Sequence, residues 1–120
     1  MSSVRRKLLV VEDDALTRNS LSDFFSETGH CVRTAEDGSA ALSKLQQEVP
    51  DIVLSDLYMP GMSGFERLSI VRLSFPTIRT IAMSGSFSDD HASPGIHADA
   101  IYRKGDLIEG LVDFLDVIAR

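Results

Sequence analysis

The chain has 120 residues, enough for one domain with a core, and its apolar (43%) and charged (25%) fractions are ordinary for a globular protein. Its formal net charge of −6 disfavours direct binding to a nucleic-acid backbone, which requires clustered lysine and arginine. A single cysteine excludes an intrachain disulfide, and no apolar run suits a membrane span or a signal peptide, so we expect a cytoplasmic protein.

The beginning of the chain predicts a loose arm, a strand and a helix. Residues 1–6 are polar, whereas the run Lys7–Val11 (KLLVV) is short and apolar, which is typical of a buried strand. Residues 15–28 then carry apolar side chains at helical spacing. Asp14 stands where it can cap this helix, and Gly29 stands just past its end.

A second strand and a second helix are expected to follow. Residues 30–35 (HCVRTA) are less apolar than the first strand, which favours an edge position in a sheet. Asp37 can cap the next helix, and Pro50 stops it. The apolar stripe of that helix consists of Gly38, Ala41, Leu42, Leu45 and Val49.

Three further strands are predicted from short apolar runs at residues 52–55, 77–84 and 100–103. Capping boxes at Ser63 and Asp106 open helices after the first and the last of these strands. The helix between them, the fourth of the chain, is expected to be short, because Pro94-Gly95 breaks a stretch of low apolar content.

Strands that alternate with helices imply a parallel sheet with helices on both faces. Five such units are too few for a closed barrel. We therefore expect one α/β domain over residues 1–120, with a doubly wound five-stranded parallel sheet of order 2-1-3-4-5. The first and third strands are then neighbours at the switch point, where ligands bind beyond the carboxyl ends of the strands.

Polar residues follow four of these strands, and the topology brings them to one edge of the sheet: Glu12 and Asp13, Asp56, Ser84, and Lys104. Three carboxylates in one crevice repel one another, which a bound cation relieves. Mg²⁺ suits such a set, because it takes one or two carboxylates together with phosphate oxygens. The pattern predicts phosphoryl transfer with Asp56 as the nucleophile, while Ser84 and Lys104 contact the transferred group.

Four motifs carry these residues: LLVVEDD (residues 8–14), DIVLSDLYMPGMSG (residues 51–64), IAMSG (residues 81–85) and IYRKG (residues 101–105). In this order and spacing they resemble the receiver domain of two-component response regulators over essentially the whole chain. The resemblance implies the CheY-like, flavodoxin-like version of the expected fold. It also implies a signalling switch in a phosphorelay rather than an ordinary enzyme, one that assists its own phosphorylation and dephosphorylation.

By this resemblance Asp56 is the phosphoacceptor, which takes its phosphoryl group from a phosphohistidine with the help of Mg²⁺. The implied Mg²⁺ ligands are Glu12, Asp13, Asp56 and the backbone carbonyl of Tyr58. Ser84 is the switch hydroxyl, and Lys104 pairs with the phosphoryl group. The implied partners are a histidine kinase or a histidine phosphotransfer domain, and an effector protein or a second copy bound through the last helix. Neither nucleic acid nor membrane is expected to bind.

The sequence departs from the family pattern at two positions near the lysine. Gly105 stands where relatives carry a proline, and Ile101 stands where they carry a switch aromatic. Tyr102 is one residue later, so on a strand its side chain points to the opposite face from that of Ile101. These departures leave open a receiver-like binding module that signals without phosphorylation. A Mg²⁺-dependent phosphohydrolase or a nucleotide or flavin binder is disfavoured, since the chain has neither G-x-G-x-x-G nor a P-loop.

Overall fold

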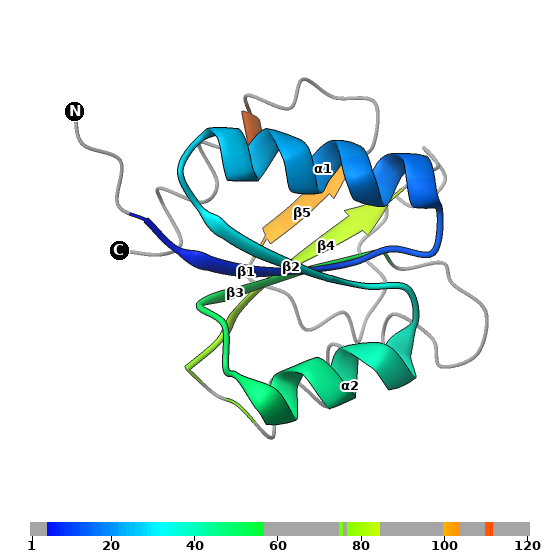
Figure 1. The fold of residues 1–120 in the computed structure, drawn as a ribbon. Helices are drawn as coiled ribbons and strands as arrows, with labels where there is room; N and C mark the ends of the chain where they lie inside the picture. The colour runs from blue at the N-terminus through cyan, green and yellow to red at the C-terminus, as the bar shows by residue number, and fades with distance from the viewer. Residues whose placement is uncertain (1–4, 57–74, 76, 85–99, 104–109, 112–120) are drawn as a thin grey trace.

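The computed structural model describes residues 5–56, 75, 77–84, 100–103 and 110–111. Within these ranges, helices α1 and α2 lie on opposite faces of a parallel sheet (Figure 1). In chain order the elements are β1 (Lys7–Val11), α1 (Ala15–Glu27), β2 (Cys31–Ala35), α2 (Gly38–Gln47), β3 (Ile52–Asp56), β4 (Arg79–Ser84) and β5 (Ala100–Arg103). The predicted α/β class, with a parallel sheet between helical layers, is confirmed for these elements.

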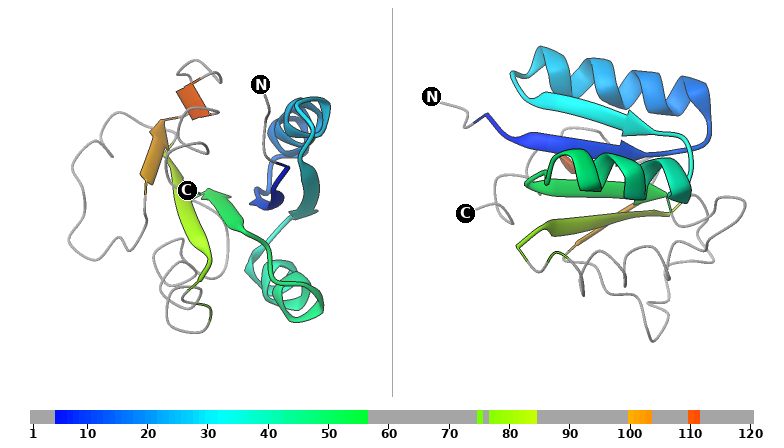
Figure 2. Two further views of the ribbon diagram at one scale, coloured as in Figure 1. Left: turned by 90° about the vertical axis from the view of Figure 1, so that its left-hand side faces the viewer. Right: turned by 60° about the horizontal axis from the view of Figure 1, so that its bottom comes forward.

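The order of strands in the sheet is β2-β1-β3-β4-β5, and each neighbouring pair is parallel (Figure 2). Strand β2 lies at an edge, as its low apolarity predicted. Strands β1 and β3 are neighbours, and Val11 of β1 is the register partner of Ser55 of β3. The next residues along the two strands, Glu12 and Asp56, are therefore brought together at the carboxyl edge of the sheet.

Alternate residues of each strand build two separate cores, one on each face of the sheet. On the α1 face, Leu8 and Val10 of β1 pack in one cluster with Leu21 and Phe25 of α1. On the α2 face the intervening strand residues pack with the apolar side of α2, in a cluster that consists of Leu9, Val11, Ala35, Ala41, Leu45, Val53 and Ile78. Successive side chains of a strand point to opposite faces of the sheet, which explains this alternation. Because the apolar side chains of β1 face these two cores, the alternation also fixes how β1 aligns with its neighbouring strands, and therefore where the acids that follow β1 lie.

The ends of the helices are fixed by the residues that the sequence indicated. The Asp14 carboxylate accepts a hydrogen bond from the Thr17 backbone N–H at 2.9 Å, and the Asp37 carboxylate accepts one from the Ala40 N–H at 2.7 Å. Each bond pairs a backbone donor that the first turn of a helix leaves without a helical partner. After α1, Gly29 adopts φ +98°, a left-handed conformation that favours glycine.

Five predicted boundaries differ from the structure, the first being α1, which ends at Glu27 rather than at residue 28. Helix α2 ends at Gln47, so Val49 lies beyond it and is 47% exposed rather than part of the apolar stripe. Strand β3 extends through Asp56 rather than ending at residue 55. Strand β2 begins at Cys31 and β4 at Arg79, one and two residues later than predicted. Residues 77 and 78 form a turn instead, in which the Ile78 N–H donates to the Phe75 carbonyl.

Several predictions concern residues outside the described part of the chain. These are the helices after β3 and β4, including the shortened fourth helix, most of the last helix, and residues 1–4 of the predicted arm. At the end of that arm, the Arg6 N–H donates to Nδ1 of His30 at 3.1 Å, and the Arg6 carbonyl accepts from the Cys31 N–H. No helix within the described ranges is both long and apolar enough to cross a lipid bilayer.

Candidate functional site

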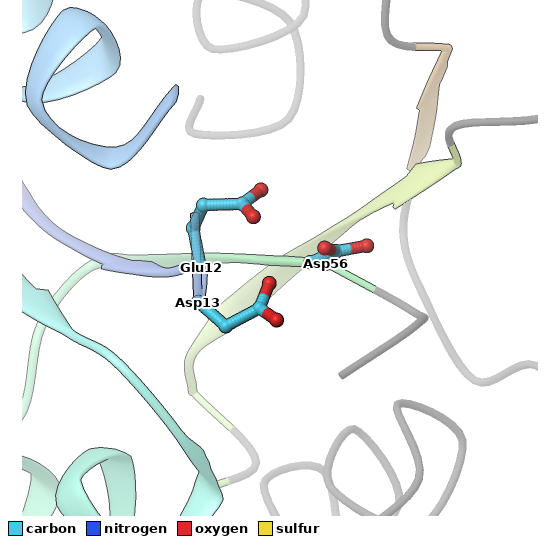
Figure 3. A group of neighbouring side chains, drawn as sticks. All are labelled: Glu12, Asp13 and Asp56. Carbon is cyan, nitrogen blue, oxygen red and sulfur yellow. The ribbon is translucent and has the colours of Figure 1, made fainter. Parts of the chain in front are cut away.

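Three carboxylates meet at the carboxyl edge of the sheet, where β1 and β3 end (Figure 3). Glu12 and Asp13 directly follow β1, and Asp56 is the last residue of β3. One carboxylate oxygen of each residue lies within 4.8 Å of those of the other two. We call these three residues the acid cluster. The structure thus brings together the three acids that the sequence assigned to one crevice.

The members of the acid cluster differ in their exposure. The side chains of Glu12 and Asp56 are buried, with 1% and 4% of their surfaces exposed, whereas Asp13 is exposed. Removing a carboxylate from water is costly unless nearby groups compensate for the lost hydration. At 4.8 Å, two negative charges in an effective dielectric of about 20 also repel by on the order of 3 kcal/mol. The cluster therefore concentrates like charge at a site where two of the three carboxylates are buried.

Hydrogen bonds accepted by the carboxylates of Glu12 and Asp14 hold the loop between β1 and α1. Oε2 of Glu12 accepts from the Asp14 N–H at 3.1 Å, and the Glu12 N–H donates to the Ala35 carbonyl at 3.0 Å, which continues the pairing of β1 with β2. The Asp14 carboxylate in turn accepts from the backbone N–H and the hydroxyl of Thr17. The third acid of the EDD motif is thus used as a helix cap and does not join the acid cluster.

Two further residues contact the main chain of the acids, and the sequence patterns did not single them out. Nη1 of Arg18 donates to the carbonyl oxygen of Glu12 at 3.0 Å and to that of Asp13 at 3.4 Å. The buried Ser55 hydroxyl donates to the Asp56 carbonyl at 3.2 Å. No sequence pattern marks Arg18, because its partners here are main-chain carbonyls, which every residue possesses.

The other predicted site residues are described only in part. Ser84 ends β4, one position beyond Met83, which is the register partner of Asp56, so its backbone reaches the same edge of the sheet. Ile101 lies on β5, and its register partner is Ala82. The side chains of Ser84 and Ile101 lie outside the described part of the structure, as do Tyr58 and Lys104 altogether. Their predicted roles stay predictions.

Tyr102, the aromatic residue next to Ile101, is described and is buried. It is 7% exposed and belongs to the cluster on the α1 face, together with its register partner Met83. Its ring therefore contributes to the core between the sheet and α1. This is the face on which Leu8, Val10 and Phe25 also pack.

The donor set of the acid cluster fits a small, hard cation. All three side chains offer oxygen, which is the ligand type that Mg²⁺ prefers. Ligands on opposite sides of a Mg²⁺ ion lie about 4.2 Å apart, given Mg–O bonds of about 2.1 Å. Separations within 4.8 Å therefore suit three acids that share one ion, either directly or through water. The cluster is thus compatible with Mg²⁺ on both chemistry and spacing.

The sequence matches the family model described as "Response regulator receiver domain" over residues 8–102. The response regulator FleR of Pseudomonas aeruginosa is 36% identical over 86 residues, which cover 72% of this chain and 18% of FleR. The two-component response regulator PhoP of the same species is 38% identical over 86 residues, which cover 69% of this chain and 38% of PhoP. The aligned region thus spans less than half the length of either relative.

Solved structures show the same likeness in three dimensions. The chemotaxis protein CheY4 of Vibrio cholerae superposes with a TM-score of 0.84 at 28% identity, and the match covers 96% of this chain and 99% of CheY4. The response regulator TrrA of Thermotoga maritima, solved in complex with Mg²⁺-BeF, gives a TM-score of 0.84 at 27% identity over 93% of this chain and 97% of TrrA. On this fold, this acidic site and this family match, the chain belongs to the response regulator receiver domains of two-component systems.

Proposed function

We propose that this chain is a phosphoacceptor switch, in which Asp56 receives a phosphoryl group from a phosphohistidine on a histidine kinase or a histidine phosphotransfer domain. The observation that carries the proposal is the geometry of the acid cluster. Asp56 is 4% exposed, and one of its carboxylate oxygens lies within 4.8 Å of oxygens of Glu12 and Asp13. Such a carboxylate is a nucleophile that is held in place and largely shielded from water.

The cofactor in this proposal is Mg²⁺, held by Glu12, Asp13, Asp56 and the backbone carbonyl of Tyr58. When bound, it would neutralise charge on the acids and on the incoming phosphoryl group. The family supports this assignment, since the response regulator TrrA was solved in complex with Mg²⁺-BeF. Glu12 and Asp13 would bind the ion from the end of β1, which leaves one oxygen of Asp56 for attack.

The transfer step needs little covalent machinery. A carboxylate oxygen of Asp56 attacks phosphorus, the P–N bond of the phosphohistidine breaks, and its electron pair returns to the imidazole, which takes up a proton. The product is an acyl phosphate on Asp56. In this proposal Lys104 neutralises the phosphoryl oxygens, and the Ser84 hydroxyl donates a hydrogen bond to one of them. Attack by water later releases phosphate, so the chain takes part in both its own phosphorylation and its dephosphorylation.

The added charge, about −1.5 to −2 at neutral pH, then biases the loops at the carboxyl edge between two conformations. Ser84 and Ile101 are the proposed switch positions, with isoleucine in place of the usual aromatic. We further propose that the domain extends over residues 1–120, that it acts in the cytoplasm, and that its output passes to an effector protein or a second copy of the chain. The acidic net charge of −6 argues against direct binding of nucleic acid.

The test is intact-mass analysis after incubation with Mg²⁺ and a small phosphodonor such as acetyl phosphate. We expect the wild type to gain the mass of one phosphoryl group, and Asp56→Asn to gain none. Asp51→Asn is the matched control, because Asp51 is an exposed aspartate at the opposite end of β3. It should be phosphorylated like the wild type.

Two results would overturn the proposal. One is a phosphoryl group that persists in Asp56→Asn, which would place the modification on another residue. The other is a wild-type chain that binds Mg²⁺ and a histidine kinase, and yet gains no mass from acetyl phosphate or from the phosphorylated kinase. That second result would leave the receiver-like binding module as the function.

A further inference from the structure

We infer that Arg18 is a positioning residue of the acid cluster, which holds the backbone of Glu12 and Asp13 in the orientation that Mg²⁺ binding requires. This inference rests on the proposed function, because it concerns the same site. Arg18 lies on α1, outside the loop, and is partly buried. Its contacts are to main-chain oxygens, so its role carries no recognisable motif in the sequence.

The geometry links one side chain to two successive carbonyl groups. Nη1 of Arg18 lies 3.0 Å from the Glu12 carbonyl oxygen and 3.4 Å from that of Asp13. A guanidinium that bonds two successive carbonyls restrains the two peptide planes that carry them, since both oxygens must face the same group. The peptide between Glu12 and Asp13 determines where both carboxylates point.

The place of Arg18 in its helix supports the same conclusion. It is the fourth residue of α1, and the beginning of a helix favours acidic residues because of the positive end of the helix dipole. The first turn of α1 contains no acidic residue. A cation at this position opposes the dipole locally, and its contacts to the carbonyls of the acids compensate for that cost.

Restraint and charge predict opposite effects on metal affinity. If Arg18 acted only through its charge, removing that charge would strengthen the binding of a divalent cation to the acid cluster. If Arg18 acts by orienting the acids, removing it weakens binding, as the loss of outer-shell partners does in other metal sites. The sign of the change therefore separates the two roles.

The first measurement uses the metal-free protein. Backbone hydrogen exchange, followed by NMR, reports on the Asp14 N–H, which donates to the Glu12 carboxylate. We expect this amide to exchange several-fold faster in Arg18→Ala than in the wild type. The Val53 amide in the buried strand β3 serves as the reference for global opening. If Asp14 is no faster than in the wild type once global opening is subtracted, the positioning role is wrong.

The second measurement is Mg²⁺ affinity by calorimetric titration, at low salt and at high salt. We expect Arg18→Ala to weaken Mg²⁺ binding about 10-fold. Arg18→Lys, which keeps the charge but lacks the planar fork, should lie between Arg18→Ala and the wild type. The loss should persist at high salt, which screens charge effects. Tighter Mg²⁺ binding by Arg18→Ala would overturn the inference.

Arg33→Ala is the matched control for both measurements. The Arg33 guanidinium also donates to two main-chain carbonyls, those of Lys44 and Glu48, but at the other end of the sheet. It should leave Asp14 exchange and Mg²⁺ affinity unchanged. The design also separates this inference from the proposed function. A wild type that binds no Mg²⁺ would reject the proposed function, while the exchange rates of Asp14 would still decide the role of Arg18.

Discussion

The two edges of the sheet treat charge in opposite ways. At the carboxyl edge, the acid cluster gathers three carboxylates, two of them buried, within 4.8 Å. At the amino edge, charges of opposite sign are paired at the surface. Nζ of Lys7 lies 2.9 Å from Oε2 of Glu48, and Nη1 of Arg33 lies 3.6 Å from Oε1 of Glu48. Oδ2 of Asp51 accepts from the Lys7 N–H. We call these four residues the amino-edge network.

The comparison separates what stabilises the fold from what prepares it for chemistry. The amino-edge network satisfies charges that are already solvated, so each pair contributes little. The acid cluster does the reverse, because it holds like charges close together at the ends of two strands. Functional sites often store such unfavourable energy. This difference predicts how Mg²⁺ and substitutions at the two edges change stability.

Adding Mg²⁺ should give the largest effect. A ligand that binds only the folded state stabilises it by about 2.7 kcal/mol at 100 times its dissociation constant. We expect Mg²⁺ to raise the free energy of unfolding of the wild type, as measured by urea denaturation. The effect should vanish in Asp13→Asn and persist in Glu48→Gln. Equal stabilisation of both variants would mean that Mg²⁺ does not distinguish the two edges.

Removing one charge from the acid cluster should stabilise the metal-free protein. Each close pair repels by on the order of 3 kcal/mol at an effective dielectric of about 20, before screening by salt. We expect Asp56→Asn to raise the free energy of unfolding in EDTA by about 1–2 kcal/mol, since the amide keeps the size of the carboxylate. Urea denaturation in EDTA measures this change. Lower stability of Asp56→Asn would show that the carboxylate is favourably paired in the fold.

Removing Arg33 should destabilise the protein without affecting the site. Its guanidinium donates to the carbonyls of Lys44 and Glu48 and to the Gln47 side chain, at the carboxyl end of α2. We expect Arg33→Ala to lower the free energy of unfolding by about 1 kcal/mol. The midpoint of urea denaturation should fall while phosphorylation of Asp56 proceeds normally. Loss of phosphorylation in Arg33→Ala would contradict this expectation, because it would show that Arg33 also affects the acid cluster.

The ion pair of the amino-edge network should give the smallest effect, visible as a pH dependence. The hydrogen bond and charge of Lys7 lower the pKa of Glu48, and Glu48 in turn raises the pKa of Lys7. The contribution of Glu48 is thus present above the ordinary pKa of a glutamate and is lost as the pH falls through its lowered value. The contribution of Lys7 is lost at high pH, as the pH rises through its raised pKa.

The difference in stability between wild type and Glu48→Gln should therefore be small and constant near neutral pH, and should shrink in acid. Urea midpoints measured from acidic to neutral pH check this expectation. Because both side chains are about half exposed, 55% and 44%, solvent screens the pair strongly. A difference that grows in acid would contradict the assigned direction of the Glu48 pKa.

The sequence patterns were sufficient to predict the elements that are defined by a local feature, such as an apolar run or a capping residue. The run of apolar residues defined β1, and Asp14 and Asp37 capped the helices they precede. Val49 was wrongly predicted to lie in α2, because the spacing of apolar residues does not show where the helical hydrogen bonds end. Glu48 is already extended, at φ −158° and ψ 131°. Ile78 was placed in a strand for a similar reason: it is buried, but in a turn.

The same distinction applies to the site. The acids could be predicted, because parallel strands place the residues that follow them at one edge. Arg18 could not, because its partners are main-chain carbonyls, which every residue possesses, and only the fold of the loop brings them within reach. The sequence therefore indicated which acidic side chains meet at the edge of the sheet, and the structure was needed to show which contacts surround them.

The most direct test of the central claim is to locate the phosphoryl group chemically. Borohydride reduces an acyl phosphate on aspartate to homoserine, and peptide mass spectrometry identifies the converted residue. After treatment of the wild-type chain with a phosphodonor and Mg²⁺, we expect homoserine at position 56, and none when EDTA replaces Mg²⁺. Conversion at another acid, or equal conversion in EDTA, would contradict the account of the acid cluster as a Mg²⁺-dependent phosphoacceptor site.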